Sequence, residues 1–186
     1  MSHDEAKTEA ALSVAEHMLG DAQASVTLLE YGDYECPACI QAEPLTQHLV
    51  KAYGKHLRFV FRHFPLVEVH PHAELAAEAA EAAAAQGQFW PMHHLLFTQV
   101  HQVRSAHHLA LPALATYAQT IGLDMIRFNA EMADRIYTQR VQEHRRAGEH
   151  SGLRATPAFF LNGAPVDVSF GFEKLEEAVQ AALKGR

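Results

Sequence analysis

The sequence is poor in cysteine, in basic residues and in long apolar runs, and each shortage excludes a class of protein. Only two of the 186 residues are cysteines, which excludes a framework of structural disulfides. Fifteen Lys and Arg residues against 22 Asp and Glu residues give a net charge of −7, which repels nucleic acid. No run approaches the roughly 18 apolar residues that a membrane-spanning helix requires. We therefore expect no nucleic-acid partner and no membrane span.

Length and composition suit one globular domain. With 186 residues, 48% of them hydrophobic, the chain can bury a sizeable core. The first 20 residues are mixed acidic and apolar, without the basic and then apolar stretches of a secretory signal. We expect a cytoplasmic protein, unless a signal was removed from the chain. The 14 histidines are expected to lie mostly at the surface.

The two cysteines, Cys36 and Cys39, are three positions apart. A disulfide that closes so short a loop constrains the unfolded chain very little, so stability does not explain the pair. Residues 25–31 are β-branched and apolar, which predicts a buried strand. Residues 37–53 have helical spacing of apolar residues, and Pro37 suits a first helical turn. Cys36 is therefore predicted at the N-terminus of a helix.

The rest of the chain continues a mixed α/β pattern. Residues 56–64 predict a second strand, which completes a right-handed βαβ unit. Helices are predicted over residues 74–86, 89–103, 111–121 and 125–146. A β-hairpin follows from residue 157, with its turn at Asn162 and Gly163. A last helix carries Phe172, Leu175, Val179 and Leu183 on one face.

A C-x-x-C pair at a strand-to-helix turn is typical of thiol chemistry. The unpaired N–H groups and the dipole of the helix stabilise a thiolate on Cys36. Such cysteines have a pKa of roughly 3.5 to 7.5 instead of about 8.5. Cys36 is therefore the expected nucleophile. Cys39, one turn further on, is expected to resolve the mixed disulfide that Cys36 forms with a substrate.

The same cysteine spacing also serves zinc, which needs four ligands in a structural site. His93 or His94 with His101 could complete such a site if the helical segment folded over the cysteines. The preceding strand, the following helix and the later Thr156-Pro157 favour redox chemistry instead. We expect no metal at the cysteines.

Several segments resemble the DsbA-like branch of the thioredoxin superfamily. They are EYGDYECPACIQAEP, FRHFPL, HPHAELAAEAAEAA, QGQFWPMHHLLF and SGLRATPAFFLNG, and the match runs from about residue 26 to 186. The resemblance implies a thioredoxin-like fold, βαβ then ββα, in a single domain spanning residues 1–186. It implies a helical insertion at approximately residues 70–148, after an N-terminal extension of residues 1–24. Disulfide exchange with cysteine-containing protein substrates and an unidentified redox partner is expected, without an organic cofactor.

The resemblance also implies roles for four residues around the cysteines. Pro157 is expected to be cis and to lie against the C-x-x-C turn. Thr156 is expected to offer backbone hydrogen bonds to the substrate chain. Pro37 and Ala38, between the cysteines, join them as expected substrate-binding residues.

Glu30 is the third candidate catalytic residue. It lies six residues before Cys36, where thioredoxin-like proteins commonly hold a buried carboxylate, and shares a strand face with Val26 and Leu28. Burial would raise its pKa and suit it to accept the proton of Cys39. The alternative is an exposed glutamate at the end of a strand.

The residues beside the cysteines predict a couple less oxidising than the periplasmic DsbA proteins, which have histidine where this chain has Ala38. Alanine cannot stabilise the thiolate, and the charge of Glu35 opposes it, unless Tyr34 and Glu35 are ordinary surface turn residues. The expected potential is roughly −150 to −250 mV. The direction, as oxidase, reductase or isomerase, stays open.

Other histidines and aromatic residues recur in similar segments of that family. We interpret them as structural, with the histidines capping helices and the Trp and Met filling the core: His70, Pro71, His72, Trp90, Met92, His93 and His94. Two rival functions stay open. One is a glutathione-dependent transferase or isomerase of the related inserted fold, against which the second cysteine argues; the other is a zinc-binding, non-enzymatic module. The sequence leaves the oligomeric state open.

Overall fold

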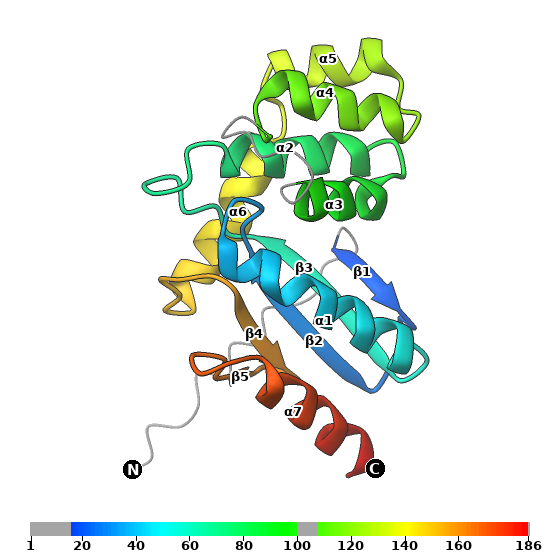
Figure 1. Cartoon of the computed structure of the whole chain (residues 1–186), viewed down its shortest axis with the longest axis vertical. Coiled ribbons are helices and arrows are strands. Elements are labelled where there is room, and N and C mark those ends of the chain that lie inside the picture. The colour runs from blue at the N-terminus through cyan, green and yellow to red at the C-terminus, as the bar shows by residue number, and fades with distance from the viewer. Residues whose placement is uncertain (1–15, 100–107, 186) are drawn as a thin grey trace.

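The computed structural model describes residues 16–99 and 108–185, which form one central sheet with helices around it (Figure 1). The sheet has five strands in the order β1-β3-β2-β4-β5. β2 and β3 are parallel, and the other neighbouring strands are antiparallel. The strands are β1 (His17–Gly20), β2 (Val26–Gly32), β3 (Leu57–His63), β4 (Ala158–Leu161) and β5 (Ala164–Val166). The expected α/β fold is confirmed.

Strand β1 lies in the N-terminal region, where the sequence predicted only an extension. It pairs with β3, with His17 opposite Phe61. Helix α3 (Phe89–Thr98) holds it in place, since the His17 ring stacks on Phe89 at 3.5 Å and Trp90 donates to the Met18 carbonyl at 3.1 Å. This strand depends on contacts with residues some 70 positions further on in the sequence. Local periodicity could not have indicated it.

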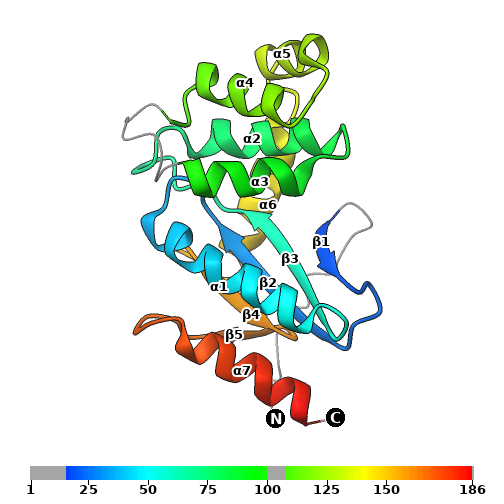
Figure 2. The ribbon, with the colours of Figure 1, turned by 45° about the vertical axis from the view of Figure 1, so that its right-hand side comes forward.

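The two faces of the sheet carry different helices (Figures 1 and 2). Helices α1 (Pro37–Tyr53) and α7 (Glu173–Lys184) share a buried apolar cluster with β2. Helix α6 (Thr138–His150) packs on the other face, where a Cβ added to Gly148 would lie 2.7 Å from the Phe64 ring. Glycine at that position lets the helix approach the sheet closely.

The remaining helices stack at one end of the sheet, between β3 and β4 in the chain. They are α2 (Ala73–Ala84), α3, α4 (Leu111–Thr120) and α5 (Met125–Ala133), with α2 in contact with all the others and with α6. Small alanine side chains on α2 are completely buried, which allows close packing of the neighbouring helices. Figure 2 shows this stack above the sheet and α6 running down behind it.

Two predicted helices differ from the structure. The single helix expected over residues 125–146 is divided into α5 and α6, because Arg135 between them has a φ of 52°. Its guanidinium bonds Glu74 and Glu78 of α2, and these contacts hold the break in place. The helix expected over residues 89–103 ends at Thr98, and residues 100–103 lie outside the described part of the chain.

The C-terminal hairpin is confirmed. Asn162 and Gly163 form its turn with φ values of 50° and 83°, which suit a two-residue hairpin connection. β5 is only three residues long and has Pro165 at its centre, opposite Phe160 of β4.

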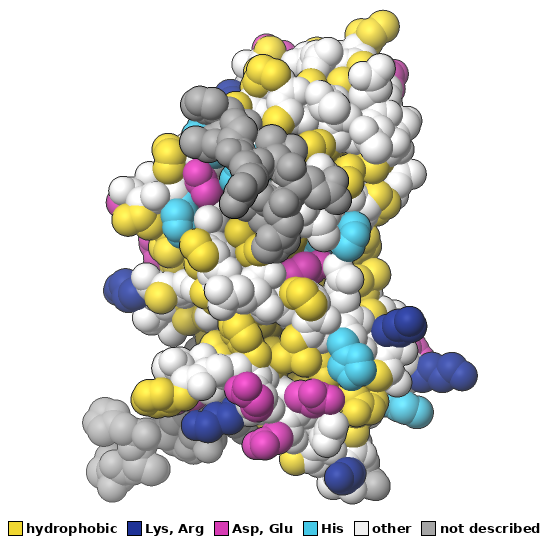
Figure 3. Space-filling model, in the orientation of Figure 1, with side chains coloured by type: hydrophobic (Ala, Val, Ile, Leu, Met, Phe, Trp, Pro, Cys, Tyr) yellow, Lys and Arg dark blue, Asp and Glu magenta, His cyan; other side chains and the backbone are white. Residues whose placement is uncertain are grey.

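Among the described residues, no helix is long and apolar enough to cross a membrane. Basic side chains are scattered over the face that Figure 3 shows.

Candidate active site

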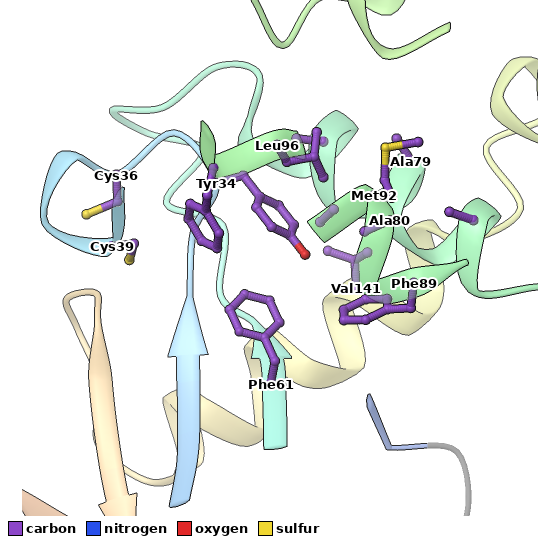
Figure 4. Packing of buried hydrophobic residues seen from close by; sticks show 14 of the residues in the cluster. Tyr34, Cys36, Cys39, Phe61, Ala79, Ala80, Phe89, Met92, Leu96 and Val141 are labelled. Atoms are coloured by element: carbon purple, nitrogen blue, oxygen red, sulfur yellow. The ribbon is translucent and has the colours of Figure 1, made fainter. Parts of the chain in front are cut away.

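The cysteine pair lies at the end of the sheet where β2 meets α1. Cys36 is the N-cap residue of α1 and Pro37 begins the helix. The Cys36 N–H donates to the Asp33 carbonyl at 3.2 Å, which folds the chain back before the helix starts. Both cysteines are in the free thiol form. Figure 4 shows the sulfur atoms of Cys36 and Cys39 close together in this turn.

Cys36 has the properties of a nucleophile. Its pKa is lowered to about 5, because the Cys39 thiol donates a hydrogen bond to its sulfur. The Thr156 side chain and the N–H groups of Cys39 and Ala38 lower the pKa further, while partial burial opposes them. Cys36 is therefore largely a thiolate at neutral pH, as the helix N-terminus predicts.

The Cys39 thiol is a weaker acid than an ordinary cysteine. Its side chain is completely buried, and its pKa is raised well above the ordinary value, chiefly by desolvation. The negative charges of Cys36 and Glu30 raise it further. The Asp33 N–H donates to the Cys39 sulfur at 3.4 Å and partly offsets this. The two thiols of one helical turn thus differ strongly in acidity.

The Thr156–Pro157 loop lies against Cys36, and its peptide bond is cis, as expected. The Cys36 thiol donates to the Thr156 carbonyl oxygen at 3.4 Å. The Thr156 hydroxyl is buried and has no hydrogen-bond partner among the described residues while Cys36 is a thiol. It is therefore available to donate to the thiolate. β4 begins at Ala158, opposite Tyr31 of β2, and this pairing brings the loop to the cysteines.

Glu30 is buried, so the exposed alternative is wrong. Its side chain is 1% exposed on the face of β2 that also carries Val26 and Leu28. Neither carboxylate oxygen has a hydrogen-bond partner among the described residues. Desolvation raises its pKa well above the ordinary value, and the charges of Glu43 and Cys36 add to this. The expected rise in pKa is confirmed.

Tyr34 and His93 form a second buried group beside the cysteines, which the sequence did not indicate. The sequence leaves Tyr34 open as an ordinary surface turn residue, but its side chain is 1% exposed and its hydroxyl lies 2.9 Å from His93 Nδ1. The His93 Nε2 atom lies 3.4 Å from a carboxylate oxygen of Glu43. Figure 4 shows Tyr34 between the redox turn and the helical stack. These contacts join the turn to α3.

Two acid–histidine pairs connect the turn to the segment before α2. Asp33 is 2.8 Å from His70 Nδ1, and Glu35 accepts from the His72 N–H at 2.7 Å. The expectation that these histidines cap helices is wrong in detail, since the His72 side chain makes no cap bond to α2 and lies 3.2 Å from Glu35. The sequence does contain two acidic residues just before Cys36 and an H-P-H segment, but only the folded structure brings the acids and the histidines together.

The remaining candidates are placed as follows. Pro37 is exposed and Ala38 is half-buried, so both lie within reach of a molecule at the turn. Met92 is fully buried in the core, as predicted, and Trp90 is partly buried. His94 lies 2.7 Å from the Gln47 amide rather than beside the cysteines, and His101 lies outside the described residues.

Comparison with known proteins decides the family. The family model described as "Thioredoxin" matches residues 12–181. The chain belongs to the thioredoxin family. Thioredoxin family membership agrees with the parallel β2-α1-β3 unit and the cis loop before β4.

Solved structures of a thioredoxin-like oxidoreductase and of DsbA-like proteins share this thioredoxin fold. A thioredoxin-like oxidoreductase from Silicibacter pomeroyi is 27% identical, with a TM-score of 0.77, over 92% of this chain and 94% of that one. BdbD from Bacillus subtilis has a TM-score of 0.80 at 21% identity, over 91% of this chain and 94% of that one. α-DsbA1 from Wolbachia pipientis has a TM-score of 0.79 at 20% identity, over 96% of this chain and 94% of that one. These neighbours support an oxidoreductase.

Curated relatives of this thioredoxin-family chain are much longer proteins. It is 42% identical over 170 residues to the Na(+)/H(+) antiporter NhaA 1 of Salinispora arenicola, covering 91% of this chain and 25% of that protein. It is 36% identical to the Na(+)/H(+) antiporter NhaA of Herminiimonas arsenicoxydans, covering 91% and 26%. The chain therefore spans about a quarter of the length of the curated relatives it matches.

Proposed function

We propose that the protein exchanges disulfides with cysteine-containing protein substrates through Cys36 and Cys39. The observation that carries this proposal is the contrast between the two thiols, with a pKa of about 5 at Cys36 and a raised pKa at Cys39. A thiolate attacks and leaves readily, whereas a buried thiol of high pKa resolves or releases the mixed disulfide.

In the oxidising direction, a substrate thiolate attacks the Cys36 sulfur of the Cys36–Cys39 disulfide. The new bond joins the substrate sulfur to Cys36, and the Cys39 sulfur leaves with the electron pair of the broken bond. A second substrate thiolate then attacks the substrate sulfur of the mixed disulfide and releases Cys36 as a thiolate. The substrate is oxidised by two electrons, and the cysteine pair is reduced by two.

Glu30 supplies the proton that Cys39 needs when it leaves. Burial raises the pKa of Glu30 well above its ordinary value, which favours the protonated form and suits it to act first as a proton donor to the buried Cys39 thiolate. In the reducing direction the same carboxylate takes the proton back from Cys39. The proton acceptor that the sequence predicts therefore describes the reducing direction alone.

The substrate chain is held beside Cys36 by the loop before β4. Thr156 offers its backbone to an extended chain, and Pro157 shapes the loop that contacts the Cys36 sulfur. The exposed Pro37 and the half-buried Ala38 complete this surface between the cysteines. We include the helical insertion, at approximately residues 70–148, in the same domain.

Variants of the two cysteines test this function. Cys36→Ser should abolish insulin reduction and the reoxidation of a scrambled substrate. Cys39→Ser keeps the attacking thiolate and should accumulate mixed disulfides with substrate proteins. Faster labelling of Cys39 than of Cys36 by an alkylating agent at slightly acid pH would contradict these roles.

Two further assays distinguish disulfide exchange from the rival transferase and zinc-binding functions. A glutathione-dependent transferase would turn over glutathione with a chloroaryl substrate and would not need Cys39. A zinc module would bind zinc through the reduced pair and show no disulfide exchange.

The redox partner is identified by trapping it on the Cys39→Ser variant. A cytoplasmic role requires a potential within reach of the glutathione pool, about −220 to −260 mV.

A further inference from the structure

Three buried polar side chains meet where the sheet joins the helical stack, and none of them belongs to the cysteine site. His17 comes from β1, His63 from β3 and Glu81 from α2. Their exposed fractions are 9%, 0% and 3%. One ligand atom of each residue lies within 4.8 Å of the others.

The sheet register brings the two histidines together. His17 lies opposite Phe61, and His63 is two residues further along the same strand. Because side chains alternate along a strand, both rings point to the face covered by α2. Packing fixes their orientation, since His17 stacks on Phe89 at 3.5 Å and His63 stacks on His144 at 5.5 Å.

Hydrogen bonds satisfy this cluster only in part. A single carboxylate oxygen of Glu81, Oε1, lies 2.8 Å from His17 Nε2 and 2.9 Å from His63 Nε2. The His63 Nδ1 atom is buried and has no partner in the described part of the chain. The other Glu81 oxygen, Oε2, accepts from Arg140 at 2.8 Å. Two imidazole nitrogens and one carboxylate oxygen therefore converge on one point.

We propose that His17, His63 and Glu81 bind one divalent transition-metal ion of the Zn²⁺ type. Imidazole nitrogen suits zinc and its neighbours, whereas calcium and magnesium prefer oxygen ligands alone. Tetrahedral zinc with bonds of about 2.0–2.2 Å holds its ligand atoms roughly 3.3 Å apart. The two nitrogen–oxygen distances are 2.8 and 2.9 Å, so a side-chain movement of about half an ångström admits the ion.

His17 and Glu81 help to line a cavity of about 410 Å³, from which a water would supply the fourth ligand. Glu16, Tyr137 and Arg140 line the same cavity, which has room for a water ligand. Arg140 opposes the metal charge, but it uses the other oxygen of Glu81 and is 28% exposed, so solvent screens it. The ion would join β1, β3 and α2, and its binding would stabilise the fold.

Zinc binding to the oxidised protein tests the site, because the disulfide removes both thiolates as competing ligands. We expect saturable binding of one Zn²⁺ per chain, measured by calorimetry and by elemental analysis after gel filtration. At a free concentration of 100 times the Kd, zinc should raise the Tm by roughly 5–10 °C. Co²⁺ in place of Zn²⁺ should show the visible bands of tetrahedral nitrogen and oxygen ligation without a sulfur charge-transfer band.

Matched variants separate the site from other histidines and acids. Glu81→Gln should weaken zinc binding by more than roughly 100-fold, since even residues outside the first ligand shell contribute 10- to 100-fold. Glu78→Gln, on the same helix and equally buried, should bind like the wild type, and so should the exposed His48→Gln. If Glu81→Gln does not fold, the wild-type stoichiometry and the Co²⁺ spectrum decide. Absence of saturable binding, full binding by a folded Glu81→Gln, or loss in His48→Gln would overturn the site.

Discussion

Replacing Thr156 with valine should make the cysteine pair less oxidising by about 30 mV at pH 7. The Thr156 side chain is one of the groups that hold the Cys36 pKa at about 5, and its hydroxyl has no other partner among the described residues. A hydrogen bond to a charged group contributes about 1.5–3 kcal/mol, and we take the lower end because several donors share the Cys36 sulfur. Loss of ~1.4 kcal/mol raises the pKa by about one unit.

The change in potential follows from the change in pKa. With a pKa of about 5, ionisation stabilises the reduced form at pH 7 by a factor of about 100, and with a pKa of about 6 by a factor of about 11. The ninefold difference corresponds to about 28 mV at 29.6 mV per tenfold change. The same calculation against a thioredoxin pKa of about 7 places the wild type about 50 mV above −270 mV, at about −220 mV.

Equilibration with glutathione buffers followed by thiol trapping measures the potential, and the pH profile of alkylation measures the pKa. The midpoint of alkylation should move from about 5 to about 6 in the variant. Thr116→Val, at an exposed hydroxyl that donates to the Pro112 carbonyl, serves as the control and should change neither value. An unchanged midpoint in Thr156→Val would refute the role of the hydroxyl, and a shifted midpoint with an unchanged potential would refute the link between them.

Three further outcomes follow from the same site. The pKa of Cys36 is lowered from 9.0 to about 5, so the free energy of unfolding of the reduced protein should fall as the pH falls from 9 to 5. The expected loss, measured by urea unfolding, is roughly 2–3 kcal/mol after allowing for solvent screening. The Cys36→Ser variant should not show this loss. Glu30 has a raised pKa, so the wild-type protein loses stability as the pH rises above 4.5. The oxidised Glu30→Gln variant should therefore be more stable than the oxidised wild type at pH 8, by roughly 1–3 kcal/mol. Equal stability of the two proteins at pH 8 would contradict an unpaired buried carboxyl group. Ala38→His should raise the potential by tens of millivolts, and a lower potential would refute the contribution of this position.

The strands and helices around the cysteines could be predicted because they are local. Residues 25–53 carry a strand, a proline in the first helical turn and a helix with an apolar stripe, each within a few residues. The Asn162-Gly163 turn needs positive φ at both positions, which that dipeptide tolerates. Burial of Glu30 followed from its place on the same strand face as Val26 and Leu28.

The parts that could not be predicted depend on contacts between distant segments. The division of the helix at Arg135 rests on partners about 60 residues earlier in the chain. The effect expected of Glu35 was incomplete for the same reason, because its carboxylate is bonded to His72 and is not among the main influences on the Cys36 pKa. Tyr34 reads as a turn residue until α3 places His93 against its hydroxyl.

The short β5 strand has a consequence for the disulfide exchange proposed above. Every open sheet edge offers backbone N–H and C=O groups to which an extended polypeptide can add as a further strand. β5 forms one edge with only three residues, and Pro165 at its centre has no N–H to offer. Under the proposed function, a substrate held at Cys36 would find little backbone on that side with which to continue pairing. Such an edge disfavours the addition of further strands, which would protect the protein from aggregation with an extended substrate.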